Sequence, residues 1–132
     1  MDERLRRMKR VAVVQEQMHR LAEQRLTRLV SEEKELRANE VALVTALDEA
    51  TLLHGFFVEQ MAKRVRRIAG QANETARQAE LQREKLLEEK RKLKQVEEAA
   101  KRLERDYLRL MERKRLEETV RPVRRIGDAS LP

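Results

Sequence analysis

Two histidines, His19 and His54, are the side chains of this 132-residue chain best suited to proton transfer or metal binding near neutral pH. They form no His-x-x-x-His pair, which would place two ring nitrogens on one helical face. Serine occurs only at Ser31 and Ser130, with no histidine beside either, and three isolated glycines cannot form a phosphate-binding loop. There is no cysteine. The sequence therefore predicts a protein that is not an enzyme and that holds no metal or cofactor.

Composition indicates long helices that pack along a narrow apolar seam. Charged residues make up 42% of the chain and aromatic residues 2%, with three glycines and two prolines. This bias favours a coiled coil over a compact core. The sequence shows no signal-peptide pattern and no apolar run long enough to span a membrane, so we expect a cytoplasmic protein.

Two rows of residues recur every seven positions in each half of the chain, which predicts two coiled-coil helices. In residues 3–50 the rows are Met8, Gln15, Ala22, Leu29, Leu36, Leu43 and Ala50, and Leu5, Ala12, His19, Leu26, Glu33, Glu40 and Leu47. In residues 61–110 they are Val65, Ala72, Ala79, Leu86, Leu93, Ala100 and Tyr107, and Met61, Ile68, Thr75, Gln82, Glu89, Val96, Leu103 and Leu110. Glutamates such as Glu33 and Glu40 weaken the middle of the first helix.

Gly55 lies where the repeat changes phase, because the row that begins at Val65 is one position out of step with Ala50. We therefore predict an all-α fold, an antiparallel coiled-coil hairpin over residues 3–118. Its parts are a helix at about 3–50, a turn at about 51–57 and a helix at about 57–118. Gly70 leaves the repeat unchanged and is predicted to lie within the second helix. Pro122 is expected to break that helix, leaving residues 119–132 as a disordered basic tail.

Side-chain size suggests how the helices face each other. When facing residue numbers sum to 108, large residues meet small ones in almost every layer, as in Leu29 with Ala79 and Leu36 with Ala72. Such compensation avoids both voids and overlaps. A register that sums to 115 fits nearly as well. The second helix extends beyond the first, leaving roughly residues 106–118 as an unpaired overhang.

Charge is unevenly placed. Residues 1–30 carry 8 basic and 4 acidic side chains, residues 31–62 carry 2 and 7, and residues 63–132 carry 21 and 13. A hairpin brings the basic ends together and leaves an apolar, acidic turn. The predicted partner-binding residues of the basic end are Arg6, Arg7, Arg10, Arg113 and Arg115. Those of the turn end are Leu53, Phe56 and Phe57, although these side chains would also be explained by packing that closes the turn.

Basic charge also raises nucleic-acid binding as an alternative, since the sequence pI is about 10.1. Acidic residues interrupt the basic ones, and no aromatic stacking platform is present, so nucleic acid is the less favoured partner. A second alternative is a generic coiled-coil adaptor or peripheral-stalk protein. A third is one continuous helix in a parallel dimer.

The chain resembles the FliJ/YscO family of type III and flagellar export proteins. The resemblance rests on the order of a first helix, a turn and a longer second helix, and on three segments of the second half. They are Gly55-Phe56-Phe57-Val58-Glu59-Gln60-Met61, the charged run from Gln82 to Lys94, and Lys101-Arg102-Leu103-Glu104-Arg105. It covers most of residues 3–118.

The resemblance implies a non-enzymatic stalk of a bacterial protein transport system. Members of the family form an antiparallel coiled coil and associate with the hexameric export ATPase. They also contact the export gate or substrate chaperones. The resemblance implies a cytoplasmic protein that is held at the inner membrane through its partners. The family offers no catalytic residues to carry over, and the apolar turn departs from the polar turn expected of it.

Overall fold

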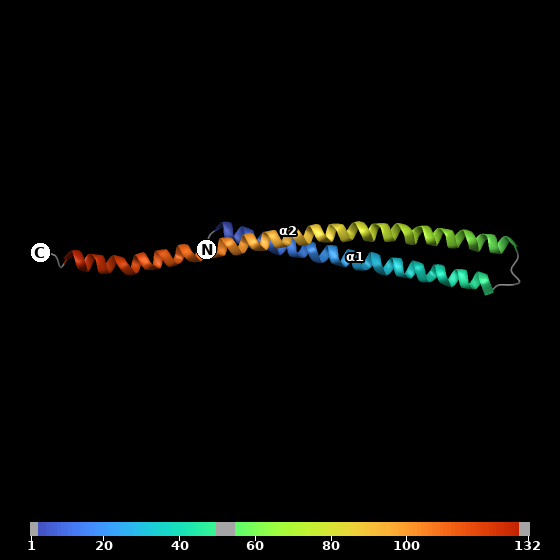
Figure 1. The fold of residues 1–132 in the computed structure, drawn as a ribbon, viewed down its shortest axis with the longest axis horizontal. Helices are drawn as coiled ribbons and strands as arrows, with labels where there is room; N and C mark the ends of the chain where they lie inside the picture. The colour runs from blue at the N-terminus through green and yellow to red at the C-terminus, as the bar shows by residue number, and fades with distance from the viewer. Residues whose placement is uncertain (1–2, 50–54, 130–132) are drawn as a thin grey trace. The chain divides into compact units, whose positions relative to one another are not determined.

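The computed structural model describes residues 3–49 and 55–129, with side chains described for residues 3–49 and 55–120. This part of the chain contains two helices and no strand: α1, Glu3–Glu49, and α2, Gly55–Ala129 (Figure 1). The prediction of an all-α hairpin of two long helices is confirmed. Residues 51–54 of the predicted turn lie outside the described residues, whereas residues 55–57 form the first turn of α2.

Local sequence favours both helices. Alanine, leucine, glutamate, lysine, arginine and glutamine dominate both, and these are the strongest helix formers. Glu3 in the first turn of α1 complements the helix dipole and lies 3.4 Å from Arg7. Arg83 and Glu80 form a similar pair at 2.9 Å in α2. Each pair adds about 0.2–0.5 kcal/mol, so helix formation here depends mainly on composition and packing.

α2 passes through two residues that disfavour helices. Gly70 lies within α2, as predicted, and an added Cβ there would meet no atom within 4 Å. The helix also continues through Pro122 and ends at Ala129, so the predicted helix end near residue 118 is wrong. The predicted tail is therefore helical as far as Ala129. Proline removes one backbone hydrogen bond, and Thr119, Val120 and Val123 beside it are weak helix formers, so helix propensity does not explain why α2 continues.

The chain divides into two compact units. Unit 1 comprises Met1–Glu16 and Arg91–Pro132, and unit 2 comprises Gln17–Lys90. Within unit 2, the second part of α1 and the first part of α2 run antiparallel, side by side (Figure 1). Within unit 1, α1 also contacts α2, since Lys9 Nζ lies 3.8 Å from a Glu104 carboxylate oxygen.

Unit 2 contains most of the tightly buried residues. Ala72 and Ala79 have no exposed surface, Leu29 is 8% exposed and Gln82 is 5% exposed. Every residue of the predicted rows that lies in the described part of unit 2 is buried or half-buried, which confirms the seam. Small residues in a seam let two helix backbones approach closely, which explains why the alanines are the most buried positions.

Two contacts in unit 2 identify its register. Arg37 Nη2 donates a hydrogen bond to Asn73 Oδ1 at 2.9 Å, next to the predicted layer of Leu36 with Ala72. Gln82 Nε2 donates to the Ala22 carbonyl at 3.2 Å. A register summing to 115 would separate these two residues by about 16 Å along the helices, beyond the reach of glutamine. The contacts therefore favour 108 in unit 2.

The seam of unit 1 ends at Tyr107, close to the start of the predicted overhang. Leu5 is 1% exposed, and the predicted α2 positions from Leu93 to Tyr107 are half-buried. Leu110 is 50% exposed, so its predicted place in the seam is wrong. The reason is that residues 3–16 of α1 cover α2 only as far as Tyr107, and every residue from Leu108 to Val120 is exposed.

Candidate partner-binding surfaces

Exposed apolar side chains lie where α1 ends and α2 begins. Phe56 is 66% exposed and Phe57 is 57% exposed, and both lie in the first turn of α2. Val58, Val41 and Val44 are also exposed. The predicted partner-binding residue Leu53 lies outside the described residues. Among the described residues, the two phenylalanines do not pack into the seam, and this leaves their rings available to a partner.

The arginines of α1 predicted for the basic end are all exposed. Arg6 and Arg10 line a shallow groove of about 540 Å³ together with Glu3 and Lys9. Arg7 instead forms an ion pair with Glu3 at 3.4 Å. Arg6 and Arg10 therefore line an open groove, while the charge of Arg7 is partly neutralised within its own helix.

Arg113 and Arg115 are exposed on the stretch of α2 that α1 does not cover. Lys9 lies opposite Glu104, so Arg113 is about 14 Å further along α2 at 1.5 Å per residue. The predicted arginines of unit 1 therefore lie on two stretches, residues 6–10 of α1 and residues 113–115 of α2.

A third group of arginines in unit 1 was missed by the sequence analysis. Arg102, Arg105 and Arg109 line a groove of about 270 Å³ with Asp106. Residues three, four and seven positions apart lie on one helical face. This spacing is readable from the sequence, but the charge-rich composition of α2 hides it among many other basic residues.

Several charges in unit 2 are neutralised inside the unit. Arg37 lies 3.8 Å from Glu33 and 3.6 Å from Glu40, the two glutamates that weaken the predicted seam, and it also bonds Asn73. Elsewhere in α2, hydrogen bonds from Arg77 lower the pKa of the Glu74 carboxyl, and the same bonds raise the pKa of Arg77. Half-buried Glu33 and Glu40 are tolerated because Arg37 lies close to both carboxylates.

His19 is half-buried in the seam and lies 3.5 Å from Glu23, while His54 lies outside the described residues. Glu16, three residues before His19, has the Glu-x-x-His spacing of some helical metal sites, so the expectation that neither histidine belongs to a metal-binding spacing is wrong for His19. Among the described residues there is no group of three or more side chains that could hold a metal ion. Neither described helix has a stretch that is long and apolar enough to cross a membrane.

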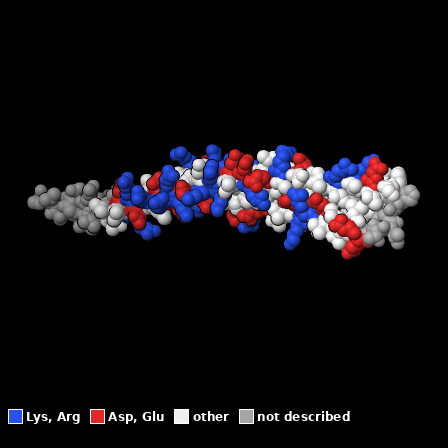
Figure 2. Space-filling model, turned by 45° about the vertical axis from the view of Figure 1, so that its right-hand side comes forward, with Lys and Arg blue, Asp and Glu red and all other residues white. Residues whose placement is uncertain are grey.

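Figure 2 shows basic and acidic side chains interspersed along the described surface, with uncharged surface beside the grey atoms of the turn region. A continuous basic face of the kind that follows a nucleic-acid backbone is absent from this view. Comparison with protein-family models, characterised proteins and solved structures finds no match to this chain.

Proposed function

We propose that this chain is a non-enzymatic coiled-coil stalk protein of a type III or flagellar export apparatus. Its partners are the hexameric export ATPase and the export gate or substrate chaperones. The proposal follows the family resemblance of the sequence, and the helical hairpin supports it. Nucleic acid and a generic adaptor role are the alternatives that the experiments below separate.

The observation that carries the proposal is the distribution of charge between the units. Unit 1 holds 18 basic and 11 acidic residues, whereas unit 2 holds 13 of each, so the whole net charge of +7 belongs to unit 1. A positively charged surface steers association with an acidic one, such as the opening of an acidic ring. Exposed Phe56 and Phe57 give unit 2 a different, apolar means of recognition.

Binding to purified export ATPase hexamer tests the role of unit 1. Arg6→Glu with Arg10→Glu should weaken binding at least tenfold at about 0.15 M salt, because both arginines line the open groove. The matched control, Lys63→Glu with Arg64→Glu, makes the same charge change in unit 2 and should have little effect. Equal losses in both variants would show that net charge alone is sensed. Absence of binding by the natural chain, or tight binding to mixed-sequence DNA at that salt, would contradict the proposal.

Binding to the cytoplasmic part of the export gate, or to a substrate chaperone, tests the role of unit 2. Phe56→Ala with Phe57→Ala should weaken this interaction while leaving helicity by circular dichroism unchanged, since both rings are exposed. Leu87→Ala is a suitable control, because Leu87 is similarly exposed elsewhere in unit 2. Unchanged binding by the double variant would remove the phenylalanines from the proposed interface.

A further inference from the structure

A groove between the two helices of unit 2 contains exposed apolar side chains that the hairpin does not use. Met18 and Leu21 of α1 are 47% and 64% exposed, and Leu81 of α2 is 49% exposed. Two adjoining depressions of about 350 and 300 Å³ lie here, and both are lined by Arg25, Gln82 and Lys85. Gln82 lies at the floor of the groove, where it is buried and donates a hydrogen bond to the Ala22 carbonyl.

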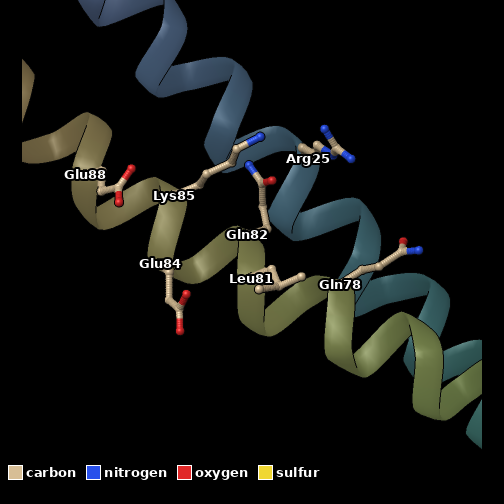
Figure 3. Close-up of a pocket in the computed structure, with 7 residues that line it drawn as sticks. All are labelled: Arg25, Gln78, Leu81, Gln82, Glu84, Lys85 and Glu88. Atoms are coloured by element: carbon tan, nitrogen blue, oxygen red, sulfur yellow. The ribbon is translucent and has the colours of Figure 1, made fainter.

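Two cations from opposite helices, Arg25 of α1 and Lys85 of α2, line both depressions. In Figure 3 the Lys85 side chain reaches from α2 toward α1, and Arg25 extends from α1 on the other side of Gln82. In the part of the chain that the structure describes, neither cation forms an ion pair, unlike Arg37, Arg77 and Arg83 of the same unit. A carboxylate placed between Arg25 and Lys85 would gain a charge-assisted hydrogen bond from each.

We propose that this groove binds an amphipathic helix of a partner protein, with one acidic margin on that helix, forming a three-helix arrangement with unit 2. The partner's apolar row covers Met18, Leu21 and Leu81, and an Asp or Glu at its margin lies between Arg25 and Lys85. Helix-in-groove recognition of this type uses apolar anchors three, four and seven residues apart. The groove is distinct from the basic groove of unit 1 and from the phenylalanines, so the proposal does not depend on the export role.

The charges of the groove also determine how the partner is oriented. Glu84 and Glu88 of α2 line the first depression and Glu89 lines the second, and Glu84 points away from α1 in Figure 3. The partner helix should therefore carry acidic residues on the margin that meets Arg25 and Lys85, and basic residues on the other margin. A second copy of the chain related by a two-fold axis is the alternative occupant, and the self-association measurement below separates it from a partner helix.

Two synthetic helical peptides of about three heptads test the proposal. Both carry a leucine row, and they differ in having glutamate or lysine on the margin that would meet Arg25 and Lys85. Fluorescence anisotropy with the full chain should show binding of the glutamate peptide and at least tenfold weaker binding of the lysine peptide. Arg25→Glu with Lys85→Glu should reverse that preference. Equal binding of both peptides, or a preference that survives the charge reversal, would overturn the proposal.

The apolar contribution needs its own variants. Leu21→Ser with Leu81→Ser should weaken binding of the glutamate peptide at least tenfold, whereas Leu87→Ser, at an exposed position that does not line the groove, should not. Helicity and melting temperature are measured for each variant. Both should change little, because Leu21, Leu81 and Leu87 are all exposed. Analytical ultracentrifugation measures whether the chain associates with itself through the groove. Self-association that is lost in the Leu21 and Leu81 variant would make a second copy the occupant and overturn the proposal.

Discussion

Unit 1 and unit 2 are built from the same two helices, but their side chains serve different purposes. Unit 2 buries Leu29, Ala72, Ala79 and Gln82 and carries equal numbers of acidic and basic residues. Among the described residues of unit 1, Leu5 is the one that is fully buried, and this unit carries the whole net charge. Unit 2 therefore contains most of the buried side chains that hold the two helices together, whereas unit 1 carries an excess of basic side chains over acidic ones.

The contacts that cross between the helices follow the same division. In unit 2, Gln82 is hydrogen-bonded across the seam while buried, and Arg37 connects two half-buried glutamates with Asn73. In unit 1 the ion pair of Lys9 with Glu104 joins side chains that are 44% and 51% exposed. Exposed ion pairs contribute about 0–1 kcal/mol, so this pair adds little to the stability of unit 1.

Exchanging a large and a small residue in the seam of unit 2 should have the largest effect. Ala79→Leu should lower the free energy of unfolding by about 1–3 kcal/mol through overpacking, and Leu29→Ala by about 2–3 kcal/mol through a cavity. The double variant should lose at least about 1 kcal/mol less stability than the sum of the two single variants, because the side chain added at residue 79 fills the space vacated at residue 29. Urea denaturation of the four proteins measures this coupling.

A control tests whether the coupling is local. Ala72→Leu combined with Leu29→Ala places the two changes one heptad apart, so their costs should add. Coupling of the same size in both pairs would mean that the layer of Leu29 with Ala79 does not exist, and with it the register assigned to unit 2.

Removing Arg37 should cost more than removing Lys9. Arg37→Ala leaves Glu33 and Glu40 half-buried without their cation and breaks the bond to Asn73, at a cost of about 1–2 kcal/mol. Lys9→Ala loses one exposed pair and should cost less than about 0.5 kcal/mol. Thermal denaturation of both variants tests the ranking, and a larger effect for Lys9→Ala would reverse the comparison of the two units.

Gly70→Ala should have the smallest effect and an opposite sign. An alanine Cβ would meet no atom within 4 Å and the glycine has no positive φ, so the change should stabilise α2 by about 0.4–1 kcal/mol. Gly55→Ala, at the first residue of α2, should stabilise less, because helix propensity counts for less at a terminus. A lower melting temperature for Gly70→Ala would show that α2 is interrupted in unit 2.

The seam was predictable from the sequence because coiled-coil packing repeats every seven residues and leaves a direct trace in residue type. The rows through Leu5, Leu29 and Ala79 were confirmed for this reason. A further row of half-buried alanines, Ala62, Ala69 and Ala76, was missed, since small residues in a helix indicate burial less clearly than leucine.

The helix end and the partner-binding surfaces were harder to predict. The steric rule for residues before proline is local, and it failed at Pro122, where α2 continues to Ala129. The separation of Arg10 from Arg113 depends on where α1 stops covering α2, which is a tertiary property. The pairing of Arg37 with Glu33 and Glu40 is visible in the sequence spacing, but its bond to Asn73 requires the register.

The most direct test of the account is an intramolecular distance in unit 2. The chain has no cysteine, so Gln24→Cys with Glu84→Cys permits spin labelling at two exposed positions on opposite helices. Pulsed electron–electron double resonance is measured after dilution with unlabelled chain, which removes distances between molecules. Antiparallel helices packed about 8–10 Å apart predict a main distance below about 30 Å. A distance near 90 Å, expected for one continuous helix at about 1.5 Å per residue, would contradict the hairpin.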